Sequence, residues 1–330
     1  MTERVDSRQS TVDRPVRIAV VGVGHLGRHH ARVAARLPGA RCTGVYDHHV
    51  GRGQEVAAEF GLRALPDAEA VAAEADAVII ATPTVSHTEL ALFFLQRGLD
   101  VFVEKPFAAT VAEADAVLAK ARSRGLLVAV GHVERHNPAV EAAIAAAPRP
   151  RFMEAQRLGM FTARGLDVDV VLDLMIHDLQ IAQALAGGPA VEVRAAGTPV
   201  VTPLIDIANA RIEFEGGFVA NLTASRVAPR KVRKMRLFAP SICVSVDMQA
   251  QEAKTFRVER DGDVPEVRAF EMAVARGEPL AREQADFVGA VRERRAPLVS
   301  GEQGRDALAL AYRVLAAVEE HRHAAEGGTV

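Results

Sequence analysis

The sequence is poor in the features that mark secreted, membrane-bound and nucleic-acid-binding proteins. Its 330 residues include only two cysteines, Cys42 and Cys243, too few for a disulfide framework or a CxxC metal knuckle. No apolar run approaches the roughly 20 residues of a membrane span, and the N-terminus lacks the apolar core of a secretory signal. With Lys+Arg 40 and Asp+Glu 42, the formal charge of -2 gives no field that would attract nucleic acid or an anionic membrane. We therefore expect a cytoplasmic protein without nucleic-acid or membrane partners.

The first part of the chain, up to about Gly131, alternates short apolar runs with helical stretches. The apolar runs are continuous in Val, Ile and Ala, which is typical of strands buried on both faces. Strand and helix in alternation predict a parallel sheet with right-handed crossovers. The fold class predicted here is α/β, a doubly wound sheet. The expected strands cover residues 17–22, 42–47, 77–82, 101–104 and 126–132.

The pattern changes after about Asn137. Residues 170–187 predict one helix, which Gly187-Gly188-Pro189 ends. Residues 208–227 alternate apolar and polar side chains around Gly216-Gly217 and predict a hairpin, and further strand-like segments follow. Two helical stretches, 280–295 and 301–323, close the chain. This half is predicted to be an α+β domain with a large, mostly antiparallel sheet.

A glycine motif follows the first predicted strand. Gly22, Gly24 and Gly27 form GxGxxG between a strand and a helix, the context in which this motif binds a dinucleotide pyrophosphate. Asp47 ends the second strand about 20 residues further on, where a carboxylate accepts hydrogen bonds from the adenosine ribose. That charge favours NAD over NADP, and Arg52 nearby leaves NADP as the alternative. The other interpretation is a plain turn and a solvated acid.

A lysine stands at the end of the fourth predicted strand, in Glu104-Lys105-Pro106. Ligands bind at the carboxyl ends of strands in such sheets. Since the chain has only five lysines against many arginines, we expect the Lys105 ammonium to contact a substrate hydroxyl and stabilise an alkoxide. The alternative is a surface lysine lying over the sheet edge.

Asp173 and His177 lie four residues apart within the predicted helix 170–187, and apolar residues surround them. A buried acid and imidazole must be paired or line a cavity, and an imidazole near neutrality can accept an alcohol proton. The alternative is a satisfied core pair. No further ligands with zinc-like spacing accompany them, so we expect no metal.

Five motifs occur in one order along the chain: GVGHLG, ATPTVSH (81–87), EKP, GHVERHNP (131–138) and the Asp173/His177 pair. In this the sequence resembles the Gfo/Idh/MocA oxidoreductases, relatives of glucose–fructose oxidoreductase and inositol dehydrogenase. The resemblance implies an NAD-dependent enzyme with a Rossmann domain and a second domain whose sheet often forms a homodimer or homotetramer. Accordingly, we divide the chain into a flexible tail (1–15), an NAD-binding Rossmann domain (16–135) and a substrate-binding and oligomerisation domain (136–330).

The resemblance also implies roles for single residues. Lys105, Asp173 and His177 match the catalytic trio. Further cofactor contacts are expected, beside Gly22, Gly24, Gly27 and Asp47, at His25, Leu26, Thr82, Pro83, His87, Glu104 and Lys105. Further substrate contacts, beside the trio, are expected at Arg135, Asn137 and Arg157. The chain departs from the family pattern at His136, where an aromatic residue is usual, at Met175, where glycine is common, and at Gln180, where a second Asp often follows.

Residues 170–180, 206–227 and 233–238 also resemble the branch of the family that acts on UDP-N-acetylglucosamine. That branch oxidises the 3-hydroxyl to a ketone on the route to 2,3-diamino sugars of lipid A. A basic run is consistent with a diphosphate ligand, although a solvated strand edge explains it as well. The run consists of Arg226, Arg230, Lys231, Arg233, Lys234 and Arg236. A free cyclitol or monosaccharide substrate, and a catalytically silent NAD-sensing regulator, remain the alternatives.

Overall fold

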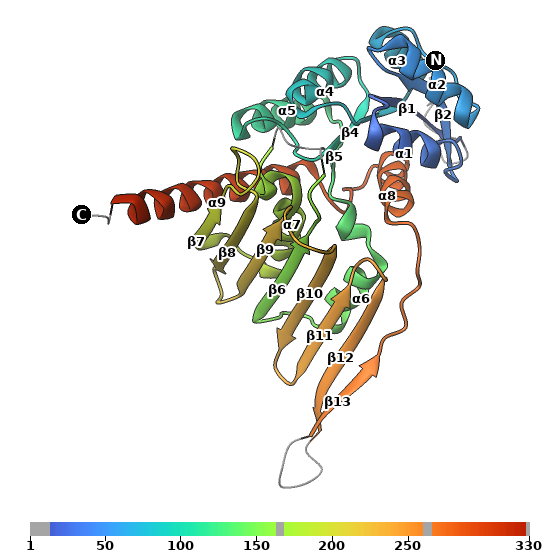
Figure 1. Ribbon diagram of the computed structural model, residues 1–330. Coiled ribbons are helices and arrows are strands. Elements are labelled where there is room, and N and C mark those ends of the chain that lie inside the picture. The colour runs from blue at the N-terminus through green and yellow to red at the C-terminus, as the bar shows by residue number, and fades with distance from the viewer. Residues whose placement is uncertain (1–13, 163–167, 260–265, 328–330) are drawn as a thin grey trace, which may run out of the picture. The chain divides into compact units, whose positions relative to one another are not determined.

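The computed structural model describes residues 14–162, 168–259 and 266–327 (Figure 1). Residues 1–13 of the predicted tail lie outside this range. Within it, the chain forms two compact units. The first comprises the residues up to Gly131 together with Leu280–Glu302, and the second comprises His132–Pro279 and the residues from Gln303 onward. The segment 280–302, which we predicted within the second domain, therefore packs in the first unit.

The first unit contains a five-stranded parallel sheet in the order β2-β1-β3-β4-β5. This confirms the predicted doubly wound α/β class. β2 lies on one side of β1, and β3, β4 and β5 lie on the other. Sheets of this kind bind ligands at this switch point, beyond the carboxyl ends of the strands. The strands are β1 (Val16–Val21), β2 (Ala40–Tyr46), β3 (Ala77–Ile80), β4 (Asp100–Glu104) and β5 (Val128–Gly131).

Helices cover both faces of this sheet (Figure 1). One buried cluster joins α1, α2 and α8 to the strands, and Phe287 and Val288 bring α8 into it. The opposite side carries α4 and α5, which contact each other. The short helix α3, which we did not predict, begins after Asp67, whose carboxylate caps it by accepting from the Ala70 N–H at 2.8 Å. The helices are α1 (His25–Ala34), α2 (Val50–Phe60), α3 (Ala68–Glu74), η1 (Thr84–Ser86), α4 (His87–Gln96), α5 (Val111–Arg124) and α8 (Pro279–Glu293).

The second unit contains an eight-stranded sheet in the order β13-β12-β11-β10-β6-β9-β8-β7. Neighbouring strands are antiparallel except for β6 and β9, which pair in parallel, so the predicted mostly antiparallel sheet is confirmed. The predicted hairpin is the β8–β9 pair. The strands are β6 (Phe152–Leu158), β7 (Ala190–Thr198), β8 (Ile207–Phe214), β9 (Val219–Ser225), β10 (Val232–Ala239), β11 (Ile242–Asp247), β12 (Glu252–Glu259) and β13 (Glu266–Glu271).

One face of the larger sheet packs against α6, α7 and α9 in a single apolar core. The single helix predicted over 170–187 is instead two pieces: a π-helical turn, η3, followed by α7. No helix among the described residues has the length and apolarity to cross a membrane. The helical elements are η2 (Val133–His136), α6 (Pro138–Ala146), η3 (Val171–Met175), α7 (Ile176–Ala186) and α9 (Gly301–Gly327).

A buried ion-pair network ties β6 to η2 and α7. Arg157 points from β6 into the core side and is 3% exposed. Its Nε and Nη2 donate to the two oxygens of Asp178 at 3.0 and 2.7 Å, and its Nη1 donates to Glu134 at 2.7 Å. Burial by itself lowers the pKa of the guanidinium, but the charges of Asp178 and Glu134 raise it above its ordinary value. Arg157 is therefore permanently charged and fully paired.

Removing this guanidinium should destabilise the fold, because it leaves two buried carboxylates without their counterion. We expect Arg157→Met to lower the free energy of unfolding by about 3–5 kcal/mol in urea titrations. The control is Arg276→Met, since the Arg276–Glu252 pair is largely exposed, with side chains 63% and 53% accessible. A change below about 1 kcal/mol is expected there. Equal losses in the two variants would contradict the assignment.

Candidate cofactor and catalytic site

The glycine motif forms a tight loop between β1 and α1. The Gly22 N–H donates to the Tyr46 oxygen at 2.8 Å, and Gly22 has a φ of +81°, which favours glycine. A Cβ on Gly27 would lie 1.8 Å from the Gly22 oxygen, so this position admits no side chain. These two glycines are required by the fold of the loop itself.

Gly24 differs from its two neighbours in the motif. It precedes α1 with φ -64°, a value open to any residue, and a Cβ built there meets no atom within 4 Å. The fold therefore does not require glycine here. The open space lies at the N-terminus of α1, where backbone N–H groups attract an anion. The loop thus fits the pyrophosphate of a dinucleotide, which needs close approach to the backbone.

Asp47 follows β2 and lies against the glycine loop. One carboxylate oxygen accepts from the Val23 N–H at 2.9 Å and the other from the His49 N–H at 2.9 Å. Arg52 approaches the same carboxylate at 3.5 Å. These bonds fix the acid beside the loop, where we predicted the ribose contact. His25 and Leu26, the other predicted contacts of the loop, are exposed at the start of α1.

The turns after β3 and β4 are joined by His87. This side chain is 1% exposed, and its two ring nitrogens lie 2.9 Å from the Thr82 and Pro106 carbonyl oxygens. Burial lowers the pKa of the imidazole below its ordinary value, against the opposing effect of both carbonyls. His87 therefore holds together the two turns that carry Thr82, Pro83 and Lys105.

Lys105 follows β4 directly, and its bond to Pro106 is cis. The Lys105 N–H donates to the Glu104 carboxylate at 3.1 Å. Glu104 is itself only 6% exposed and accepts from His30. The Lys105 side chain therefore begins at a turn whose backbone contacts the Glu104 carboxylate on one side and the His87 ring on the other.

In the second unit, Asp173 lies in η3 and His177 in the first turn of α7. They occupy consecutive turns. The turn that carries Asp173 is π-helical, however, so the two residues do not share the single regular α-helix that we predicted. The His177 ring is 9% exposed and meets His132 edge-on, with ring centroids 5.6 Å apart. Asp173 lines a cavity of about 300 Å³.

The residues of the basic run line different surfaces. Arg226, Lys231 and Arg233 line the cavity together with Asp173. Lys234 and Arg236, which alternate with Arg233 along β10, lie on the opposite face of the sheet and border a different groove. Lys231 also borders a third groove together with Arg230 and Lys234. The sequence alone did not show which of these cations line the cavity, because it did not give the residue at which β10 begins.

Both arginines of the cavity are held by internal contacts. Arg226 donates to the Val168 oxygen, and its Nε lies 3.7 Å from Asp206. Arg233 donates to the Leu158 oxygen at 2.9 Å. Burial, reinforced by the Arg157 charge, lowers the pKa of Arg233 to about 10. A group of cations around one acid favours an anionic ligand.

Two predicted substrate contacts have internal roles instead. Arg157 is committed to the buried network with Asp178 and Glu134. Asn137 caps α6 by accepting from the Ala139 N–H at 3.1 Å, and its amide donates to the Met248 oxygen at 3.0 Å. Both side chains are therefore occupied within the unit, and we remove them from the substrate site.

Arg135 differs from those two. Its Nε is buried and has no hydrogen-bond partner among the described residues, and burial lowers the pKa of its guanidinium. A ligand acceptor would satisfy this nitrogen.

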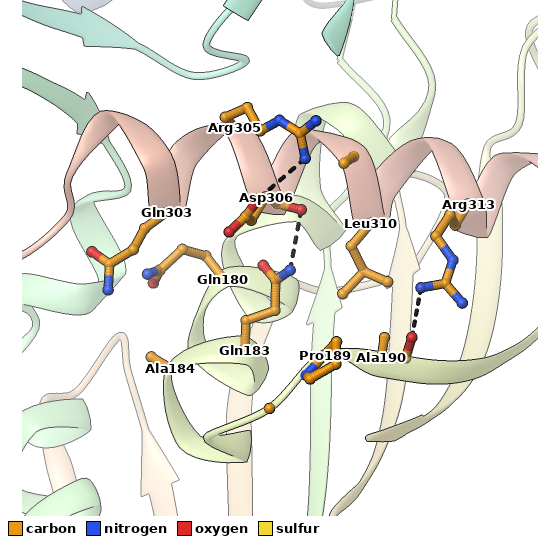
Figure 2. A pocket seen from close by; sticks show the side chains of 12 residues that line it. Gln180, Gln183, Ala184, Pro189, Ala190, Gln303, Arg305, Asp306, Leu310 and Arg313 are labelled. Atoms are coloured by element: carbon orange, nitrogen blue, oxygen red, sulfur yellow. Dashed lines mark hydrogen bonds and ion pairs between the residues drawn. The ribbon is translucent and has the colours of Figure 1, made fainter. Parts of the chain in front are cut away.

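A separate groove of about 520 Å³ lies between α7 and α9 and does not include the predicted catalytic residues (Figure 2). Gln183 from α7 donates to the Asp306 oxygen of α9 at 3.1 Å. Arg313 of α9 donates to the Ala190 oxygen at 2.7 Å. Gln180, which departs from the family pattern, is 1% exposed and borders this groove.

Comparison with known proteins agrees with this geometry. Residues 16–132 match the model "Oxidoreductase family, NAD-binding Rossmann fold", and residues 140–240 match the "GFO/IDH/MocA C-terminal domain". The chain belongs to the Gfo/Idh/MocA oxidoreductase family. This Gfo/Idh/MocA protein is accordingly an NAD-binding oxidoreductase, as its motifs predicted.

Two curated relatives of this Gfo/Idh/MocA protein act on different substrates. It is 41% identical over 92% of its length to the UDP-N-acetylglucosamine 3-dehydrogenase of Acidithiobacillus ferrooxidans, of which it covers 97%. A solved structure of that enzyme superposes with a TM-score of 0.87 at 40% identity, covering 92% of this chain and 98% of that one. The scyllo-inositol 2-dehydrogenase (NAD(+)) of Bacillus subtilis is 30% identical over 66% of this chain and 69% of its own length.

The contrast between two glycines provides a test of the cofactor site. We expect Gly24→Ala to melt within about 2 °C of the wild type but to bind NADH at least about tenfold more weakly, because the new methyl group fills space meant for the pyrophosphate. Gly27→Ala should instead lower the melting temperature, since its Cβ overlaps the Gly22 oxygen. NADH fluorescence titration and thermal melts measure both. Unchanged NADH affinity in Gly24→Ala would contradict the assignment.

Proposed function

We propose that this oxidoreductase oxidises the 3-hydroxyl of UDP-N-acetylglucosamine to a ketone with NAD. The observation that carries the substrate class is the cavity in the second unit, where Arg226, Lys231 and Arg233 accompany Asp173. Three cations suit a diphosphate, which a free cyclitol lacks. The near full-length similarity to a UDP-N-acetylglucosamine 3-dehydrogenase supports the same substrate.

The proposed chemistry assigns one role to each of three side chains. His177 accepts the proton of the reacting hydroxyl, as an imidazole near neutrality can. The Lys105 ammonium donates a hydrogen bond to the same oxygen and stabilises negative charge on it. Asp173, which lines the cationic cavity, holds this network of side chains in place. Bound NAD supplies the acceptor for the hydride that leaves the carbon.

We also propose where the protein acts and how it assembles. A 3-keto sugar is the substrate that an aminotransferase needs to form a 2,3-diamino sugar for lipid A, so the enzyme would supply that step in the cytoplasm. Self-association as a homodimer or homotetramer would use the sheet face opposite α6, α7 and α9. That face is polar and hollowed, and Gln156, Asn209, Asn221 and Thr223 line its groove.

Loss of either catalytic nitrogen should separate chemistry from cofactor binding. Lys105→Ala and His177→Ala are each expected to lower kcat by about 10²–10⁴-fold, because the developing alkoxide loses its donor or its base. NADH affinity should change little. NADH absorbance with NAD and UDP-N-acetylglucosamine reports turnover, and fluorescence titration reports binding. Full turnover in both variants would refute the mechanism, and no NADH formation by the wild type with any sugar would favour the regulator.

Two cations of the basic run, one beside the cavity and one on the opposite face of the sheet, provide a pair of variants that tests the contact with the diphosphate. Lys231→Ala removes a cation beside Asp173 and should raise KM for UDP-N-acetylglucosamine about tenfold, the value of one charge-assisted hydrogen bond. Arg236→Ala removes an exposed cation from the opposite face, where it pairs with Glu154, and should leave KM unchanged. If both variants behave alike, or if a free inositol is the better substrate, the proposed diphosphate contact is wrong.

A further inference from the structure

Two imidazole rings meet inside the second unit. His132 directly precedes η2 and is 1% exposed, and His177 lies in the first turn of α7 and is 9% exposed. The ring centroids are 5.6 Å apart and the ring planes stand at 86°, so the edge of one ring meets the face of the other. This arrangement is one that aromatic pairs prefer. His132 was not among the residues predicted for the site.

The buried ion-pair network of Arg157 joins the two elements that carry these rings. Arg157 donates at 3.0 and 2.7 Å to Asp178, the residue after His177. The same guanidinium donates at 2.7 Å to Glu134, two residues after His132. One side chain therefore connects the first turn of α7 with η2, and this connection limits how far the two histidines can move apart.

The helix of His177 does not by itself fix the plane of the imidazole ring. The last side-chain torsion of a histidine is broad, so the groups packed against the ring decide its orientation. His177 is also the second residue of α7, immediately after the π-helical η3, where the backbone changes from one helical geometry to another. The plane of the ring therefore has to be set by neighbouring side chains, and His132 is such a neighbour.

A general base has to keep one ring nitrogen directed at the proton that it accepts. The base nitrogen must come within about 3 Å of the hydroxyl oxygen, so a rotation of the ring plane moves this nitrogen out of reach. The edge-on contact with His132 resists such a rotation, because the two rings would lose their preferred arrangement. A fixed neighbouring ring thus preserves the reactive orientation of His177.

We propose that His132 is a positioning residue for His177: its ring fixes the plane of the His177 imidazole, and the Arg157 network holds the two rings together. The inference rests on the proposed function because it takes His177 as the base. It also gives Arg157 a role at the site. The motifs predicted that Arg157 contacts the substrate, whereas here it acts through Asp178 and Glu134.

Two substitutions separate this role from simple packing. His132→Phe keeps a flat ring against His177, so kcat should stay within about twofold of the wild type. His132→Leu fills similar space without a ring and should lower kcat about five- to tenfold, the value of one aromatic contact. KM for the sugar and NADH affinity should change little in both variants. Equal kcat values in the two variants, or a loss that appears in KM instead, would overturn the proposal.

The ring contact can be tested separately by NMR, without sugar or turnover. An aromatic ring changes the chemical shifts of protons close to it, so the ring C–H signals of His177 report the presence of a neighbouring ring. These signals are assigned by their loss in His177→Ala. They should move further from their wild-type positions in His132→Leu than in His132→Phe, because only the leucine variant lacks a ring at position 132.

Phe152→Leu is the matched control, because it removes a ring from another pair of the same unit. Phe152 and Phe238 have ring centroids 5.8 Å apart, and Phe152 begins β6 whereas Arg157 lies near its end. This variant should leave the His177 signals in place. Unmoved signals in His132→Leu, or an equal movement in Phe152→Leu, would overturn the proposal. Because the spectra need no substrate, they decide the ring contact even if the proposed sugar is wrong.

Discussion

The chemistry of the first unit is governed by the complete burial of its parallel strands. β3 and β4 expose almost nothing, so their side chains are available only to the core. Polar groups can reach a ligand only from the residues that follow each strand. The glycine loop after β1, the Thr82 turn after β3 and Lys105 after β4 therefore meet at one edge of the sheet. Parallel pairing brings these three turns to the same side.

The second unit shows how a partner decides the role of a charge. Arg157 and Arg233 face each other across β6 and β10. The first is enclosed by two carboxylates and holds the fold together, and the second borders a cavity beside Asp173. Both are arginines on the core side of the same sheet. They differ in their hydrogen bonds: Arg157 donates to two carboxylates, whereas Arg233 donates to the Leu158 and Val232 backbone oxygens.

The segment Leu280–Glu302 belongs to the first unit, although the residues immediately before and after it belong to the second. Phe287 and Val288 anchor α8 in the Rossmann core, and Gln284 of the same helix donates to His30, which in turn contacts Glu104 at the end of β4. The turn that carries Lys105 is thus linked, through Glu104 and His30, to a helix almost 180 residues further along the chain.

Local patterns in the sequence were sufficient for the strands of the Rossmann sheet, the glycine loop, Asp47 and the position of Lys105, because strand periodicity and turn chemistry act over a few residues. They were also sufficient for the β8–β9 hairpin around Gly216-Gly217. They did not determine that Arg157 and Asn137 are internal, that η3 interrupts the helix of Asp173, or that Gln284 of α8 contacts His30. Those outcomes depend on which distant groups meet in the folded chain, since burial and ion pairing are properties of the whole core and not of any segment.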